Sequence, residues 1–319
     1  MTNTFRPANG RRRRARVAAL TLSLPLAGVL LAGCASTGVA GEPGSNAGAG
    51  ASGIRPDVQA LLTEELRGAL EDQLPEGYAN GEPMQVATDA TIGIPIATFD
   101  ENNEHIEGLA VDMAQAVSWV LGRDASISHA VWDTLIPGLE AGRFDYVTTV
   151  MLDTEVRQEQ VDFVDYLADG SSILVQTESD FNDLTVGTMC GLSVGVMRGS
   201  YEEFLLTEQN PACDEPIDIQ VYAGINEGML AVQSERVDAM MGAASQLTYV
   251  ETMSNGALRS AGDVVEPGID GIAIAKDSPL VPAIQAAVQE LMDTGVYMEI
   301  LALYGMEQNA IDAATINLG

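Results

Sequence analysis

Lysine and histidine are scarce in this chain. Lys276 is the only lysine among 319 residues, and the only histidines are His105 and His129. In total, 15 Lys and Arg stand against 46 Asp and Glu, for a formal net charge of −31. Six of the basic residues are arginines within positions 6–16, so the rest of the chain is even more acidic. Such a chain repels phosphate backbones and anionic lipids, which excludes nucleic-acid binding and attachment to a membrane by charge.

Long hydrophobic runs are also missing, except near the N-terminus. Residues 17–32 are apolar, follow the arginines at 11–16 and lead into Leu-Ala-Gly-Cys at 31–34. A basic segment followed by a short apolar one is typical of a secretory signal peptide and too short for a membrane span. The four residues that end it resemble the lipobox of bacterial lipoprotein precursors. We therefore predict a signal peptide over 1–33 and a lipid on Cys34, with a plain secretory signal as the alternative.

The next segment, residues 34–53, contains mainly glycine, alanine and serine and is nearly uncharged. This composition is typical of a flexible tether. The mature protein is thus expected on the outer face of the cell membrane, in contact with it only through its lipid. At 46% hydrophobic residues, the whole chain can bury a sizeable core, which excludes a mostly disordered protein.

Only two other cysteines follow, Cys190 and Cys213. Exported proteins meet oxidising conditions, where an even pair of cysteines predicts a disulfide. The spacing of the cysteines and histidines matches no zinc signature. We therefore expect a disulfide here, and neither a metal nor a cofactor.

Beyond the tether, strand-like and helix-like segments alternate. An amphipathic helix is expected within 54–81, over 56–74, outside the main core. Further helices are expected over 109–121, from 133 to about 141, from Ser200, over 226–234, and as two helices within 281–304. Strands are expected over 84–88, 126–130, 146–150, twice within 185–196, and over 217–222, 237–241 and 271–275. This alternation predicts α/β layers with mostly parallel strands.

Several stretches carry a resemblance to a known family. They include MQVATDAT at 84–91, AVWDTLIPGLEAGRFDYVTT at 130–149, LSVGVMRGSYEE at 192–203 and SERVDAMMG at 234–242. In order and spacing, the segment from Met84 to about Tyr304 resembles the family 3 extracellular solute-binding proteins. These are the ligand-capturing subunits of polar-amino-acid-type ABC importers, and the lipobox and cysteine pair look most like their actinobacterial branch.

The resemblance implies a two-lobed α/β fold of the type II periplasmic-binding-protein kind, with a sheet flanked by helices in each lobe. Lobe 1 would comprise 82–169 and 268–319, and lobe 2 would comprise 170–267. The ligand would bind in the cleft, and closure about crossings near 169–172 and 264–268 would present it to a permease. The implied protein is a monomer and not an enzyme, and its partners are an ABC permease and ATPase.

The resemblance also implies six ligand-binding residues. Arg157 matches the arginine that grips a ligand carboxylate in a bidentate pair. Ser200 and Tyr201 match a helix N-terminus that binds the same anion. Thr149 matches a hydroxyl at a strand end, and Asp89 matches an acid at the end of the first strand. Trp132 matches an aromatic that stacks on the ligand side chain. The structural alternatives are a surface position for Arg157 and ordinary helix capping for Ser200 and Tyr201. For Trp132 the alternative is core packing, and for Asp89 it is an N-cap or a turn.

Other positions depart from the family pattern. The α-ammonium of the ligand is normally held by a Ser or Thr and an Asp, where this chain has Leu152 and Ala243. Ala110 replaces another acid, and no aromatic follows Asp89. A buried ammonium without an acceptor is costly. The ligand is therefore expected to be a carboxylate whose amine is absent, ring-bound, alkylated or held elsewhere, with Asp89 as the candidate acceptor. An ectoine, a betaine or an amino acid in a rearranged pocket would fit.

Two further functions share this resemblance. A ligand-sensing lipoprotein would need the same closing cleft, so the sequence does not separate sensing from transport. Cyclohexadienyl dehydratases resemble the family too, but they need a cleft acid or base, for which only Asp89, Glu155 or Tyr201 is available. Neither histidine lies in a matched cleft segment. A binding subunit of an importer is therefore the expected function.

Overall fold

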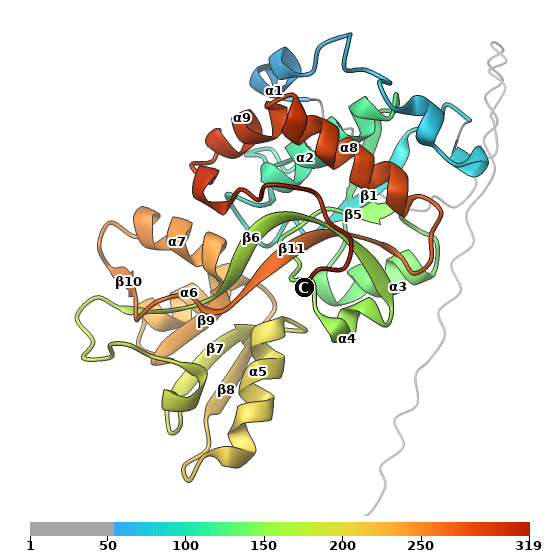
Figure 1. The fold of residues 1–319 in the computed structure, drawn as a ribbon. Helices are drawn as coiled ribbons and strands as arrows, with labels where there is room; N and C mark the ends of the chain where they lie inside the picture. Colours follow the sequence, from blue (N-terminus) through green and yellow to red (C-terminus); the bar gives the residue numbers. More distant parts are fainter. Residues whose placement is uncertain (1–53, 79) are drawn as a thin grey trace, which may run out of the picture. The chain divides into compact units, whose positions relative to one another are not determined.

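The computed structural model describes residues 54–78 and 80–319 (Figure 1). The predicted signal peptide over 1–33, the tether over 34–53 and the lipid site at Cys34 all lie outside the described residues. Among the helices that the model does describe, none is both long enough and apolar enough to cross a bilayer.

One mixed sheet runs through the described chain in the order β4-β1-β5-β11-β6-β9-β7-β8, with β10 paired to β6 beside this path. The outer strands on each side pair in parallel, as the alternating pattern predicts, but the central strands are antiparallel. The strands are β1 (Met84–Thr88), β4 (Ala125–His129), β5 (Tyr146–Val147), β6 (Val161–Gln176), β7 (Ser193–Met197), β8 (Asp218–Tyr222), β9 (Ala239–Ala243), β10 (Leu258–Ser260) and β11 (Val265–Ala275). A separate hairpin joins β2 (Thr98–Phe99) to β3 (Ile106–Glu107).

The helices gather in two groups along this sheet (Figure 1). Helices α2, α8 and α9 contact one another beside β1 and β4, whereas α5 and α6 contact β7 and β8. The buried side chains of α2, α8, α9 and α6 belong to one apolar cluster, and α5 packs on a second, smaller one. The helices are α1 (Pro56–Leu61), α2 (Leu109–Val120), α3 (Leu135–Glu140), α4 (Glu155–Gln158), α5 (Tyr201–Gln209), α6 (Ile225–Gln233), α7 (Ala244–Met253), α8 (Val281–Asp293) and α9 (Val296–Ala302).

Strands β6 and β11 are the longest in the sheet, at 16 and 11 residues. They pair antiparallel, with irregularities between Val265 and Gly268 and between Asp270 and Gly271. Both segments predicted as crossings, 169–172 and 264–268, fall within or beside this pair. The first half of β6 pairs with β11, which itself pairs with β5, and the second half of β6 pairs with β9 and β10.

The prediction of one helix over 56–74 is wrong. Helix α1 ends at Leu61, and the following residues form turns and a short 3-10 helix at Glu71–Gln73. The reason is tertiary hydrogen bonding: the N–H groups of Gly68 and Leu70 donate to the carbonyls of Trp119 and Val120. Those carbonyls end α2, and that of Trp119 also accepts from the Gly122 N–H in the turn that follows the helix. The segment therefore leaves the helical path to cap α2.

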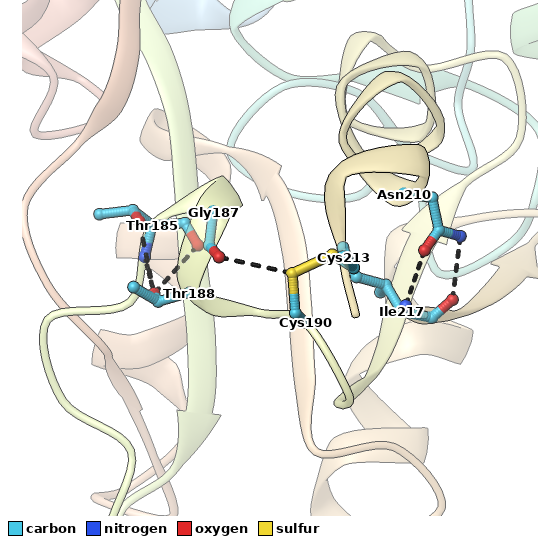
Figure 2. The surroundings of a disulfide bond; sticks show 7 residues. All are labelled: Thr185, Gly187, Thr188, Cys190, Asn210, Cys213 and Ile217. Atoms are coloured by element: carbon cyan, nitrogen blue, oxygen red, sulfur yellow. Dashed lines mark hydrogen bonds between the residues drawn. A yellow bond between two sulfur atoms is a disulfide. The ribbon is translucent and has the colours of Figure 1, made fainter. Parts of the chain in front are cut away.

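The prediction of two strands within 185–196 is half right, because only Ser193–Met197 forms a strand, β7. Val186–Thr188 is a 3-10 turn instead. Its backbone groups bond locally: the Thr185 N–H donates to Oγ1 of Thr188, and that hydroxyl donates to the Thr185 carbonyl (Figure 2). Local side-chain bonds of this kind compete with strand pairing.

The predicted disulfide between Cys190 and Cys213 is confirmed (Figure 2). The two Cα atoms lie 5.4 Å apart, and the bond ties the turn before β7 to the segment before β8. On the far side of that segment, Asn210 closes the loop, because its side chain accepts from the Ile217 N–H and donates to the Ile217 carbonyl. The disulfide and this amide together fix the approach to β8.

Removing the disulfide should lower the stability of the protein. The bond spans 23 residues, and closing a loop of that length stabilises by about 3 kcal/mol in the chain-entropy model. We expect the double variant Cys190→Ser and Cys213→Ser to lose roughly that free energy of unfolding in urea titrations. Wild-type protein denatured without reductant should show no free thiol from this pair. An unchanged urea midpoint in the double variant would contradict the prediction.

The N-terminal segment docks through a buried acid on α2. Asp112 is fully buried, accepts from the Tyr304 hydroxyl at 2.5 Å, and lies 3.6 Å from Nη1 of Arg55. Arg55 also donates to the Tyr304 hydroxyl at 2.7 Å. Burial raises the pKa of Asp112 to about 6, against the opposing effects of these two partners. The folded protein therefore favours the protonated acid more than the unfolded chain does.

The stability contribution of Asp112 should depend on pH. The folded state retains the proton between the ordinary carboxyl pKa and about 6, so this contribution is complete at low pH and is lost as pH rises through 6. We expect wild type to lose about 3 kcal/mol relative to Asp112→Asn between pH 4 and pH 8. Urea titrations across this range test it, with the exposed Asp72→Asn as control. A pH-independent difference between wild type and Asp112→Asn would refute the pKa assignment.

Candidate functional site

Arg157 is held in place by the segment that follows β5. Residues 151–153 run beside β11, where the Asp153 N–H donates to the Ile269 carbonyl and the Gly271 N–H donates to the Met151 carbonyl. Thr154 then caps α4, accepting from the Arg157 N–H at 3.3 Å. This places the Arg157 side chain, on a four-residue helix, directly beside the middle of the sheet.

The guanidinium of Arg157 has few partners in the protein. Its Nη1 donates to the Leu152 carbonyl at 2.8 Å, and its central carbon lies 5.8 Å from the centre of the Trp132 ring. No carboxylate of the described residues lies within salt-bridge distance of it. Burial lowers its pKa, while the nearby acids Glu202 and Asp270 act in the opposite direction. A partly buried cation without an anion is suited to bind one.

Ser200 and Tyr201 begin α5 on the other group of strands. The Ser200 hydroxyl accepts from the Glu203 N–H at 3.2 Å and so caps the helix. The Glu203 carboxylate accepts from the N–H of Gly199 rather than from that of Ser200. The Tyr201 ring stacks on Phe204, with centroids 6.0 Å apart. Ser200 and Tyr201 line the same two pockets as Arg157, and a helix N-terminus carries N–H groups and a positive dipole end.

These residues meet at a small cavity of about 30 Å³. Residues from both groups of strands line it, among them Trp132, Leu152, Arg157, Ser200, Tyr201 and Ala243. Two hydrogen bonds join its two sides: the Trp132 indole donates to the Gly199 carbonyl at 3.1 Å, and the Gln246 amide donates to the Ile92 carbonyl. A volume this small accommodates about one water molecule, so a larger ligand requires the two sides to separate.

A larger pocket of about 850 Å³ adjoins the small cavity. The two share Leu152, Arg157, Ser200 and Tyr201, and the larger one continues along 266–269 of β11 to the C-terminal residues. Arg157 lies at their junction. Leu152 packs close to β11 there because Gly268 has no side chain; a Cβ at that position would lie 2.5 Å from Leu152 Cδ1.

Asp89 does not reach either cavity. It is fully buried, and its carboxylate accepts from the Trp132 N–H at 2.8 Å and from the N–H and hydroxyl of Thr91 at 2.8 and 2.6 Å. His129 Nδ1 lies 3.6 Å from it. Its bonds position Trp132 and close a turn with Thr91.

Thr149 is likewise buried beneath the site. Its backbone carbonyl accepts from the Tyr166 hydroxyl at 3.0 Å, and its own hydroxyl has no hydrogen-bond partner among the described residues. It lines neither of the two cavities. Of the six predicted ligand-binding residues, the structure therefore brings together Trp132, Arg157, Ser200 and Tyr201.

Two acids at the small cavity were missed by the sequence reasoning, Glu202 and Asp270. Glu202 is buried and accepts from the Ser171 hydroxyl at 2.7 Å. Asp270 is 2% exposed and lies inside β11. The sequence does carry a signal for Asp270, an acid directly before an apolar strand, but the predicted strand begins one residue later, at Gly271.

The chain is similar to several known binding proteins in sequence and in structure. The arginine-binding protein ArgT of Corynebacterium glutamicum is 28% identical over 269 residues, which covers 82% of this chain and 83% of ArgT. Among solved structures, an ancestral arginine-binding protein bound to arginine has a TM-score of 0.64 and 28% identity, covering 70% of this chain and 98% of the other. A mutant of ArgBP from T. maritima has a TM-score of 0.65 and 25% identity, with coverages of 71% and 96%.

These similarities confirm the predicted fold, that of the type II periplasmic binding proteins. The relatives are named for binding rather than for catalysis, and this chain is a binding protein and not an enzyme. The model of the bacterial extracellular solute-binding proteins, family 3, matches residues 84–307. The chain therefore belongs to family 3 of the bacterial extracellular solute-binding proteins.

Proposed function

We propose that this protein captures a small, carboxylate-bearing, amino-acid-like solute and delivers it to an ABC permease with its ATPase. The observation that carries the proposal is the Arg157 guanidinium, partly buried and without a carboxylate partner, at the junction of the two cavities. The N-terminus of α5 at Ser200 and Tyr201 lines the same two cavities and would add N–H donors for an anion. Trp132 would cover the ligand from the side.

The relatives support an amino acid as the ligand class. The Corynebacterium relative is named for arginine, and the ancestral arginine-binding protein was solved with arginine bound. All α-amino acids share the carboxylate that Arg157 would bind. The side chain of the ligand would extend from the junction toward the larger pocket, whose volume of about 850 Å³ exceeds what one amino acid needs.

Ligand entry would proceed by movement of two lobes, 82–169 with 268–319 and 170–267. The small cavity supports this motion, because its volume of about 30 Å³ and the two hydrogen bonds that join its sides leave no room for a ligand. Opening would break the bond from Trp132 to Gly199 and the bond from Gln246 to Ile92. Closure on a ligand would then create the surface that a permease recognises.

The place of action follows from the N-terminal sequence. Export by the signal peptide over 1–33, lipidation of Cys34 and a tether over 34–53 would hold a monomer at the outer face of the cell membrane. The family description as extracellular proteins supports the location outside the cytoplasm.

A thermal-shift screen of residues 54–319 identifies the ligand. The panel contains the standard amino acids, their Nα-acetyl derivatives, ectoine, glycine betaine and dicarboxylates. A ligand that binds only the folded protein raises the melting temperature, by an amount equivalent to about 2.7 kcal/mol at one hundred times Kd. We expect a carboxylate-bearing member of the panel to shift the midpoint.

The variant Arg157→Ala should then lose the ligand. Removing one partner of a buried charge pair costs about 2–5 kcal/mol, which corresponds to roughly 30-fold or greater weakening. Calorimetry with the ligand from the screen measures this loss. Arg198→Ala, which removes an exposed arginine near α5, is the matched control and should bind like wild type. Affinity of Arg157→Ala within about threefold of wild type would contradict the role of Arg157.

A further inference from the structure

We propose that Asp270 binds the α-ammonium group of the ligand, and that this ammonium replaces a proton that Asp270 shares with Asp169 in the free protein. The inference rests on the proposed function, because it concerns the same solute. It assigns the amine to Asp270 in place of Asp89, which lines neither cavity, and it predicts that binding releases a proton.

Asp169 and Asp270 lie on neighbouring strands of the sheet. Asp169 on β6 is opposite Gly268 on β11, so Asp270, two residues further along β11, lies diagonally across from Asp169 on the same face of the sheet. Diagonal neighbours on antiparallel strands are within reach of each other's side chains. Burial and the neighbouring Asp169 raise the pKa of Asp270, and burial raises that of Asp169. One shared proton would therefore lie between the two carboxyls, on Asp270.

Asp169 and Asp270 differ in the hydrogen-bond donors that surround them. Asp169 is well supplied with donors: the N–H and hydroxyl of Ser245 donate to its two oxygens at 2.9 and 2.5 Å. Asp270 is 2% exposed and lines the small cavity, yet no N–H or O–H of the described residues donates to its Oδ2. A buried carboxyl oxygen without a donor is costly and rare in native proteins. Its position at the cavity indicates that the donor comes from the ligand.

The charges around Asp270 support an incoming cation. Facing it are Asp169 on β6, Glu202 on α5 and Arg157 on α4. Tyr166 on β6 is fully buried, and burial raises its pKa further above neutrality, so it contributes no charge. Burial and the neighbouring Asp169 both raise the pKa of Asp270, and Arg157 opposes them only in part. The ionised form of Asp270 thus lacks a cation that an ammonium would supply.

Asp270 can take the place of the ammonium acceptors that the family pattern has and that this chain lacks. Leu152 and Ala243, which stand where the family has a hydroxyl and an acid, both line the small cavity. Asp270 lines the same cavity and lies on β11, separated from Ala243 on β9 only by β6. The Asp270 carboxyl on β11 therefore lines the space that an acid in place of Ala243, at the end of β9, would line. Arg157 at the same cavity would bind the carboxylate of the same amino acid.

Binding of the ammonium would displace one proton from Asp270. In the free protein, Asp270 holds one proton and donates it to Asp169. The ligand arrives as an ammonium, which donates its own N–H groups to Asp270, and the Asp270 O–H bond breaks so that its proton passes to the buffer. Since the free protein holds more protons than the complex, raising the pH favours the complex. Affinity should rise with pH by up to tenfold per pH unit until the free protein has lost this proton.

Calorimetry on residues 54–319 tests the inference. Each standard amino acid that binds is compared with its Nα-acetyl derivative, and proton release is obtained by repeating the titration in phosphate and in Tris at one pH. The variant Asp270→Asn keeps the shape and a donor toward Asp169, so we expect it to fold with an unchanged or higher melting temperature. It should bind the free amino acid at least about tenfold more weakly and release no proton, since the titrating group is gone. Asp263→Asn, an exposed acid before β11, is the matched control and should behave as wild type.

The outcomes separate this inference from the proposed function. Wild-type binding of a free amino acid, with proton release that Asp270→Asn abolishes, supports it. Equal affinity for the Nα-acetyl derivative, binding by Asp270→Asn within about threefold of wild type, or binding of ectoine or glycine betaine alone overturns it while leaving the role of Arg157 intact. Unchanged binding by Arg157→Ala defeats the proposed function instead, and a panel without any binder defeats both.

Discussion

The antiparallel pairing of β6 with β11 is the constraint on which the rest of this structure depends. These two strands alone carry the chain between the parallel strands β4, β1 and β5 and the parallel strands β9, β7 and β8. Their pairing places Asp169, Gly170, Gly268 and Asp270 at the centre of the sheet. The segment at 151–153 pairs with β11 in turn and so fixes the start of α4. Any functional side chain near the middle must therefore be positioned by this pair or next to it.

Strands in the middle of such a sheet are normally apolar, and much of β6 and β11 follows that rule, with Phe163, Val164 and Ile272 fully buried. The acids at 169 and 270 break the rule next to each other. Two adjacent buried carboxyls destabilise the fold unless a proton or a cation lies between them. Local violations of this kind are expected where a protein binds something, because the ligand supplies the missing partner.

The sequence predicts those features that depend on local periodicity and on capping. Helix α2, strand β7 and the Ser200 cap of α5 follow from short-range patterns and lie within a few residues of their predicted bounds. Features set by distant partners are missed. The segment after Leu61 leaves its helix to bond the end of α2, and Asp89 turns inward to bond Trp132. Asp270 is missed for the same reason, because only the pairing of β11 with β6 brings it beside Asp169.

The same geometry explains how a ligand could favour the closed arrangement. In this structure Arg157 has no carboxylate partner and Oδ2 of Asp270 has no donor among the described residues. In the proposed closed form without ligand, each of these groups would lose water without gaining a partner, which would raise the free energy of that form. The bonds from Trp132 and Gln246 compensate in part. An amino acid would carry an anion for Arg157 and a cation for Asp270, so its contacts would be strongest in the closed form. Differential affinity of that kind is what a ligand needs to shift a protein from open to closed.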